Sequence, residues 1–234
     1  MSNFLPSTAN EQANVYEKSI AGIDLTENYS LGKVASSILN EDPKLLLFTL
    51  SRYKFVSKMF AGKQRILEIG CQEGFGALLI DHSLTKYVGL DFYLPHINSA
   101  ITRFSHKSNF HFYHHDVLSG PHSDEQFDAI FSLDVLEHIP PEAEHAFFLT
   151  SLKYLRESEG PLIIGMPSLE SQKYASERSK IGHVNCKSKA ELKRVCEKYF
   201  RNVFTFSMND EVMHTGFDQM SHYVFALCVT PHAQ

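Results

Sequence analysis

Three acidic residues stand at the ends of three expected strands, and this spacing is the part of the sequence best suited to chemistry. They are Glu68, Asp91 and Asp116. Open α/β sheets bind ligands at the carboxyl ends of their parallel strands, so the three carboxylates are expected at one crevice. A carboxylate in the position of Asp91 can accept hydrogen bonds from both hydroxyls of a ribose.

A glycine turn surrounds the first of these acids in the segment EIGCQEGFG, residues 68–76. Glycines at a strand-to-helix turn let the backbone approach a ligand and point helix N–H groups at it. The dinucleotide fingerprint G-x-G-x-x-G requires glycine where Gln72 and Phe75 stand, so a dehydrogenase is disfavoured. The absence of a GK[ST] tripeptide excludes a P-loop. An acid two residues before Gly70 instead suits a ligand that carries a positively charged amine.

His138 is the best-placed titratable group for catalysis, because it follows the fourth expected strand in the segment LDVLEHIP, residues 133–140. The unperturbed pKa of a histidine lies near neutrality, so a neutral imidazole there can remove a proton from a hydroxyl. The alternative is that His138 only caps the next helix or bonds a carbonyl. Glu137 either orients His138 or faces solvent.

Two polar loops carry further candidates. Residues 167–187 follow the fifth expected strand and contain His183, and residues 208–221 join the last two strands and contain His214. Structureless connections longer than about 15 residues are uncommon in compact domains and are usually binding loops or lids. We therefore expect both loops to face an acceptor, and 167–187 to order when ligands bind. For any single polar residue of these loops, a solvated surface position is the alternative.

No metal site is predicted from the histidine and cysteine spacing. His111, His114 and His115 share one expected strand, and strand alternation sends His114 and His115 to opposite faces. The four cysteines form no CxxC pair, so neither a structural zinc site nor a disulfide framework is expected.

The elements that position these residues alternate between strands and helices. Short apolar runs predict strands at 65–71, 87–92, 110–116, 127–133, 161–166, 203–207 and 223–230. Helical spacing predicts helices at 75–83, 96–104, 142–156 and 189–200, with one or two more within 31–60. This order predicts an α/β fold, a doubly wound, mostly parallel seven-stranded sheet with an antiparallel last strand and an N-terminal helical extension.

Length and charge bound the function classes. The 234 residues, 43% hydrophobic and 21% charged, fit one structural domain, with 1–60 as an arm and helices packing on the core of 61–234. The net charge of −5 without a basic block argues against a nucleic-acid or anionic membrane partner. No apolar run approaches the ~18 residues of a membrane helix, and the first residues lack signal-peptide features. A cytoplasmic protein is expected.

Four segments together carry a family resemblance. ILEIGCQEGFG, VGLD, HHDV and FDAIFSLDVLEHIP resemble, in this order, the class I S-adenosylmethionine-dependent methyltransferases. The resemblance covers roughly residues 60–230 and is most specific over 65–140. It implies the Rossmann-like methyltransferase fold, S-adenosylmethionine as cofactor and S-adenosylhomocysteine as product.

The resemblance also implies roles for residues along the strand ends. It assigns the methionine end of the cofactor to Glu68, Gly70, Cys71 and Gly74, the ribose to Asp91 and Phe92, and the adenine amine to Asp116 and Val117, with Leu133 and Asp134 lining the same pocket. The family usually has glycine in place of Gln72, and the extra Gly76 is expected to offset this departure. Similar LEHI segments occur in small-molecule O- and N-methyltransferases, which makes His138 the first catalytic candidate, before His183 and His214.

The sequence therefore predicts methyl transfer to an oxygen or nitrogen atom of a small, polar, carbohydrate-related metabolite. The polar loops favour a hydroxylated or charged acceptor, and RYKF and GHVN are similar to segments of methyltransferases from bacterial surface-polysaccharide clusters. A quinone- or lipid-precursor methyltransferase and a non-catalytic cofactor-binding partner protein are the alternatives. The sequence does not identify the acceptor or the atom that is methylated. It also leaves open whether the protein is a homodimer and whether a metal assists.

Overall fold

The computed structural model of the protein describes residues 9–23, 30–80, 83–156 and 160–233. The chain divides into two compact units, residues 1–30 and residues 31–234. In the first unit, helix α1 spans Ala9–Ile20, a helix that the sequence analysis did not predict because the segment has no apolar period. Its side chains from residue 10 to residue 19 are exposed, so burial does not stabilise this helix. The high helix propensity of residues such as alanine, glutamate and glutamine favours it instead.

The second unit is built on one sheet, to which the described residues contribute eight strands in the order β3-β2-β1-β4-β5-β8-β6-β7. The strands are β1 (Arg65–Ile69), β2 (Lys86–Asp91), β3 (Phe110–His114), β4 (Ala129–Leu133), β5 (Leu162–Pro167), β6 (Phe200–Asn209), β7 (Val212–His214) and β8 (Tyr223–Pro231). The first five pair in parallel, and β8 pairs antiparallel with both β5 and β6. The prediction of a mostly parallel sheet with an antiparallel last strand is confirmed.

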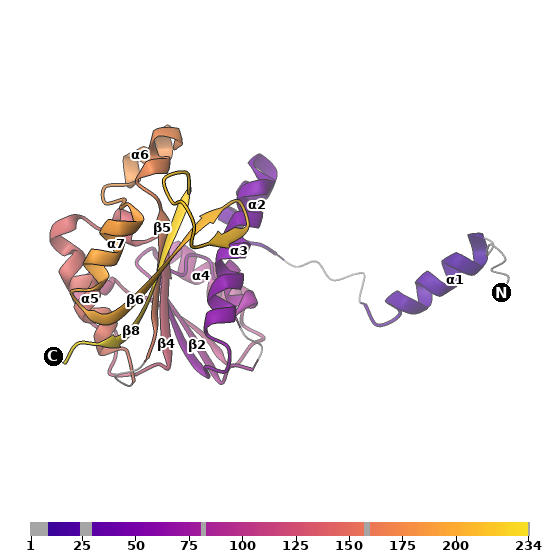
Figure 1. Cartoon of the computed structure of the whole chain (residues 1–234). Coiled ribbons are helices and arrows are strands. Elements are labelled where there is room, and N and C mark those ends of the chain that lie inside the picture. The colour runs from indigo at the N-terminus through magenta and orange to yellow at the C-terminus, as the bar shows by residue number, and fades with distance from the viewer. Residues whose placement is uncertain (1–8, 24–29, 81–82, 157–159, 234) are drawn as a thin grey trace, which may run out of the picture. The chain divides into compact units, whose positions relative to one another are not determined.

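Helices cover both faces of this sheet (Figure 1). The α-helices of the unit are α2 (Lys33–Glu41), α3 (Pro43–Met59), α4 (Leu94–Arg103), α5 (Glu144–Lys153), α6 (Glu177–Gly182) and α7 (Lys189–Cys196). Short 3₁₀ helices follow several strands: η1 (Phe75–Leu79), η2 (Val117–Ser119), η3 (Leu136–His138), η4 (Pro141–Ala143) and η5 (Glu170–Tyr174). No helix in the described ranges has the length and apolarity needed to cross a lipid bilayer.

Strand alternation divides the core into two apolar layers. Leu67 of β1 packs in a cluster with Phe147 of α5 and Leu192 of α7. Its neighbour Ile66 packs in the other cluster, with helices α3 and α4. Successive strand residues point to opposite faces, so each nearly continuous apolar strand supplies both layers, as expected for a sheet covered on both sides.

The structure differs from the expected elements in two places. An eighth strand, β7, adds three residues to the edge of the sheet by pairing antiparallel with the end of β6. The helix expected over 75–83 is the single 3₁₀ helix η1, and the end of that range includes residues 81 and 82, which lie outside the described residues. Glycines 74 and 76 flank Phe75 at the start of this segment, and their low helix propensity disfavours a longer α-helix there.

Candidate functional site

A cavity of about 630 Å³ lies at the carboxyl ends of β1, β2, β3 and β4. Its size falls within the range of roughly 300–1,000 Å³ typical of small-molecule sites. Of the residues predicted for the site, seven line it: Gly70, Asp91, Phe92, Asp116, Val117, Asp134 and His138. The topology therefore gathers the ends of four successive parallel strands, as the sequence pattern predicted.

The glycine turn after β1 depends on Gly70. Its φ is +84°, and a Cβ placed on it would lie 2.1 Å from Cγ2 of Val135. Only glycine fits both conditions without displacing Val135, which lines the cavity. Gln72 takes a left-handed conformation with φ +47° despite its side chain. It stands where the methyltransferases that the sequence resembles usually have glycine.

Asp91 at the end of β2 holds this turn in place. Its Oδ2 accepts a hydrogen bond of 2.9 Å from the backbone N–H of Gln72, and its Oδ1 accepts one of 2.8 Å from that of Tyr93. A carboxylate oxygen has two lone pairs, so each oxygen retains one for a ligand hydroxyl. The side chain is buried in the protein yet borders the cavity, which suits the ribose-binding role proposed for it.

Asp116 lies at the start of η2, on the far side of β2 from the glycine turn. Its Oδ1 accepts a hydrogen bond of 2.9 Å from the backbone N–H of Leu118, so the side chain caps the 3₁₀ helix. The position after β3 and the lining of the cavity by Asp116 and Val117 agree with the proposed adenine end.

Glu68 is not in the cavity, although the resemblance implied contact with the cofactor. The side chain is fully buried, and its carboxylate accepts hydrogen bonds from the hydroxyls of Tyr53, at 2.5 Å, and Tyr87. Burial raises the pKa of Glu68 to about 7, against the hydrogen bonds of the two tyrosines, which lower it, while nearby Asp91 adds to the rise. In this structure both oxygens of Glu68 are engaged by tyrosines, and the residue does not line the cavity.

Gly76 also has a packing role. A Cβ there would lie within about 2.2 Å of the ring atoms of Tyr53, so only glycine lets that ring of α3 reach Glu68. The expectation that Gly76 also offsets the missing glycine at Gln72 stays a prediction. Cys71 and Gly74 likewise lie in the core, where Phe112 packs beside Gly74.

Glu73 connects the same turn to the N-terminal helices. Its buried carboxylate accepts hydrogen bonds of 2.9 Å from the backbone N–H groups of Lys33 and Val34, in the first turn of α2. The first N–H groups of a helix have no partner within the helix, so Glu73 satisfies two of them and places a negative charge at the positive end of the helix dipole.

The end of β4 contains a second non-glycine residue in the left-handed region, Asp134 with φ +56°. Nη1 of Arg52, a buried residue of α3, donates to both carboxylate oxygens of Asp134, at 3.0 and 2.8 Å. The guanidinium of Arg52 also lies over the ring of Tyr223, 3.9 Å from its centroid. Leu133, predicted to line the pocket, is buried in the core and does not border the cavity.

Glu137 is fully buried. The interpretation that its side chain faces solvent is therefore wrong. Neither carboxylate oxygen has a hydrogen-bond partner among the described residues. Burial raises the pKa of Glu137 well above its ordinary value, and the negative charge of Asp134 adds to the rise. Its backbone carbonyl accepts hydrogen bonds of 2.8 and 2.9 Å from the N–H groups of Val184 and Asn185 in the loop after β5.

His138 lines the cavity and bonds a carbonyl, as the alternative interpretation proposed. Its Nδ1 lies 2.8 Å from the carbonyl oxygen of Gly182, and its ring centroid is 5.2 Å from that of His183. The carbonyl can only accept, so Nδ1 carries the proton and Nε2 is the basic nitrogen. His183 packs beside His138, whereas His214 of β7 bonds Oδ1 of Asn209 at 2.7 Å and does not line the cavity.

The loop over 167–187 is fixed at its ends and more exposed in its middle. Ser168 and Lys187 form a parallel bridge, and the ammonium of Lys187 lies 2.7 Å from the carboxylate of Glu144 and 2.9 Å from Oδ1 of Asn185. The middle contains η5 and α6, where Tyr174 is strongly exposed. Ordering on ligand binding stays a prediction, and these anchors confine it to about residues 170–182.

Sequence reasoning missed several residues of the cavity wall. Tyr93 and His96 border it from the start of α4, and His115 from the end of β3. The rings of Tyr93 and His96 pack edge to face with centroids 4.8 Å apart. Tyr93 and His96 could have been predicted from their positions soon after Asp91, because residues that follow a strand end lie at the same crevice.

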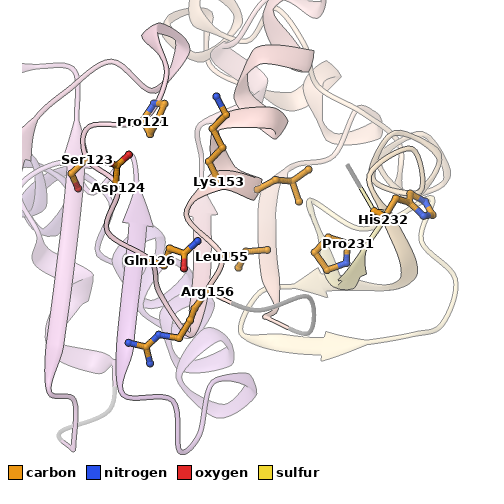
Figure 2. A pocket seen from close by; sticks show the side chains of 11 residues that line it. Pro121, Ser123, Asp124, Gln126, Lys153, Leu155, Arg156, Pro231 and His232 are labelled. Atoms are coloured by element: carbon orange, nitrogen blue, oxygen red, sulfur yellow. The ribbon is translucent and has the colours of Figure 1, made fainter.

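A second cavity, of about 580 Å³, lies at the opposite end of the strands, near the starts of β4 and β5. Figure 2 shows its wall, which includes Gln126 before β4, Arg156 before β5 and Pro231 at the end of the antiparallel β8. None of the residues predicted for the site lines this cavity. The arrangement of acids, glycine turn and histidine belongs to the first cavity alone.

Comparison with protein families matches residues 66–158 to a model described as a methyltransferase domain. The matched range contains the glycine turn, Asp91, Asp116 and His138. Comparison with curated protein sequences found no match.

Solved structures with the same fold include several methyltransferases. The N-methyltransferase NodS from Bradyrhizobium japonicum WM9, in complex with S-adenosyl-L-homocysteine, is 17% identical over 86% of this chain and 95% of its own, with a TM-score of 0.66. The methyltransferase domain of bacterial CtHen1-C is 17% identical over 80% of this chain and 100% of its own, with a TM-score of 0.65. The DhpI–SAH complex is 17% identical over 86% and 92%, with a TM-score of 0.62. The protein has the Rossmann-like fold of these methyltransferases.

Proposed function

We propose that this protein, an S-adenosylmethionine-dependent methyltransferase by its domain match and its fold, methylates an oxygen or nitrogen atom of a small, polar, carbohydrate-related metabolite. One observation carries the proposal. A single cavity is bordered both by the acids suited to the cofactor, Asp91 and Asp116, and by a basic nitrogen suited to an acceptor, Nε2 of His138.

The residues of the cavity fit the cofactor. Asp91 offers one remaining lone pair on each oxygen to the two ribose hydroxyls. Gly70 leaves the turn without a side chain where the amino-acid end would approach, and Asp116 stands at the far wall for the adenine amine. When bound, the cofactor supplies an electrophilic methyl group.

The acceptor side needs a nucleophile held in line with the methyl group and protected from water. A hydroxyl must also lose its proton, and Nε2 of His138 is positioned to accept it, because the Gly182 carbonyl fixes the proton on Nδ1. Gly182, the last residue of α6, lines the cavity beside His138, so this helix can close over an acceptor. The polar loops favour a hydroxylated or charged molecule over an apolar quinone or lipid precursor.

The test is methyl transfer from radiolabelled S-adenosylmethionine to a panel of acceptors. The panel contains nucleotide sugars, free sugars and amino sugars, with a quinone precursor and a short RNA as contrasting arms. Product is expected in a sugar arm and in neither contrasting arm. Turnover only on the quinone precursor or only on RNA would replace the proposed acceptor class. Binding of S-adenosylhomocysteine without turnover on any arm would favour the non-catalytic alternative.

A further inference from the structure

The end of β4 and the loop after β5 bring three metal-ligating side chains together. One ligand atom from each of Glu137, His138 and His183 lies within 4.8 Å of the ligand atoms of the other two. Nε2 of His138 is 3.9 Å from Oε1 of Glu137. We propose that these three side chains bind a divalent first-row transition-metal ion beside the cofactor cavity.

Hydrogen bonds prepare both histidines as ligands. Nδ1 of His138 donates to the carbonyl of Gly182, and Nδ1 of His183 lies 2.8 Å from Oε1 of Gln172. The amide nitrogen of Gln172 donates to the carbonyl of Ser168, which fixes Oε1 as the acceptor for His183. Each imidazole thus keeps its lone pair on Nε2. A backbone or side-chain acceptor on the other ring nitrogen is the arrangement seen around metal-bound histidines.

Glu137 supplies an independent observation that points to a ligand at this cluster. Its carboxyl group is fully buried, and no described residue donates a hydrogen bond to either oxygen. A buried polar group without a partner is costly, and natural proteins rarely keep one unless a ligand satisfies it. A metal ion is such a ligand, and its charge would stabilise the ionised carboxylate as the displaced proton leaves to water.

The donor set indicates the class of ion. Two imidazole nitrogens and one carboxylate oxygen suit Mn²⁺, Fe²⁺, Co²⁺, Ni²⁺ or Zn²⁺, whereas Mg²⁺ and Ca²⁺ prefer oxygen ligands. Three ligands at about 2.1 Å from one ion in tetrahedral geometry lie about 3.4 Å apart, so the most distant pair in the cluster must approach by up to about 1.4 Å. His138, whose side chain is half exposed, has room for this shift. Three protein ligands leave positions open, as in catalytic metal sites.

The position of the cluster suggests what the ion would do, and this step rests on the proposed function. His138 and Gly182 border the cavity, so an open coordination position would face the acceptor. A divalent ion lowers the pKa of a bound hydroxyl, which favours a hydroxylated acceptor over an amine. His138 would then act as a ligand in place of a free base. Loss of Glu137 or His183 would slow transfer under the metal role but would affect a free base little.

The experiment has two parts. In the first, the protein is titrated with Mn²⁺, and the paramagnetic resonance signal of the free ion reports binding. In the second, the protein competes with a chromophoric chelator for Zn²⁺. One ion per chain is expected. Glu137→Gln, His138→Gln and His183→Gln should each weaken binding at least tenfold. Gln172→Leu, which removes the acceptor behind His183 together with the hydrogen bond to Ser168 but leaves all three ligands in place, should weaken it about 10–100-fold. His106→Gln, at an exposed histidine outside the cluster, is the matched control and should bind normally.

Calorimetry with S-adenosylhomocysteine in the presence of a chelator separates folding from metal binding. Each variant should keep the wild-type cofactor affinity and circular dichroism. Failure of the wild-type protein to bind either ion, or equal binding by the wild type and the Glu137 and His183 variants, would overturn the metal site and leave the methyl-transfer proposal intact. Stoichiometric binding without turnover on any acceptor would support the metal site and count against the proposed function.

Discussion

Nη1 of Arg52 reaches both carboxylate oxygens of Asp134, which ties helix α3 to the residue that follows β4. The side chain of Arg52 is only 9% exposed and that of Asp134 is 30% exposed, so the pair is largely protected from solvent. Asp134 lines the cavity in a left-handed backbone conformation, and the ion pair fixes the position of its side chain there. The pair lies 82 residues apart in sequence, and neither residue alone predicts it.

Replacing Asp134→Asn is expected to destabilise the protein by about 2–3 kcal/mol, because it leaves the buried Arg52 without its counterion. Asparagine tolerates the left-handed conformation, so backbone strain does not contribute. Urea unfolding measures the change. The control is Glu197→Gln in the half-exposed Lys193–Glu197 pair, expected to cost under about 0.5 kcal/mol. An Asp134→Asn protein as stable as wild type would show that Arg52 has another adequate partner.

Replacing Asp91→Ala should lower the affinity for S-adenosylhomocysteine by about 1.5–3 kcal/mol. The change removes charge-assisted hydrogen bonds to the ribose and the support of the turn at Gln72. Isothermal titration calorimetry measures the loss. Asp124→Ala, at an aspartate of the second cavity, serves as control and should bind normally. Unchanged affinity in Asp91→Ala would remove the residue from the cofactor site.

Replacing Gly70→Ala is expected to abolish measurable cofactor binding, because the new methyl group must displace Val135 from the cavity wall. Gly62→Ala is a matched control. Gly62 has φ +82°, close to the +84° of Gly70, but has no atom within 4 Å of its added Cβ. It should cost only the backbone strain, about 1–2 kcal/mol of stability, with normal binding. Partial rescue of Gly70→Ala by Val135→Ala would identify the clash as the cause; equal binding by both glycine variants would refute it.

The pKa of Glu68 predicts a loss of stability as the pH rises. The value is about 7 in the folded protein against 4.5 for an unperturbed glutamate, so the folded state holds an extra proton between these values. Stability should be full below about pH 4.5 and fall by roughly 3 kcal/mol as the pH rises to about 7. Glu68→Gln should flatten this part of the curve, while Glu177→Gln, at an exposed side chain, should not. Urea midpoints between pH 5 and pH 8 provide the comparison.

Replacing His138→Ala should reduce turnover by about 10²–10⁴-fold if the acceptor is a hydroxyl, because its proton must leave during transfer. Affinity for S-adenosylmethionine should hardly change, since the cofactor-side acids are untouched. A neutral amine needs no such help, so the loss would then be much smaller. His106→Ala provides an exposed histidine control. Full activity of His138→Ala on the true acceptor would refute the role of His138 as the base and make His183 the next candidate.

The sequence was sufficient for the parts of the fold that are repeated and local. Apolar runs marked the parallel strands, and the acids at their ends marked the cavity. The supporting contacts could not be read in the same way. Tyr53 of α3 and Tyr87 of β2 both donate hydrogen bonds to Glu68 of β1. Only the three-dimensional packing shows that these tyrosines engage the carboxylate that the sequence analysis assigned to the cofactor. The strand β7 was not predicted, because an edge strand of three residues is too short to show an alternating pattern.

The buried carboxylate of Glu73 joins events in the folding of this chain that are 40 residues apart in sequence. The first turn of α2 lacks its N–H acceptors until Glu73 arrives, and Glu73 lacks its donors until α2 docks. Closing a loop of that length costs entropy before either group is satisfied. The glycine turn and the first turn of α2 therefore satisfy each other's polar groups, and we expect a ligand that rigidifies the glycine turn to slow the release of α2 as well.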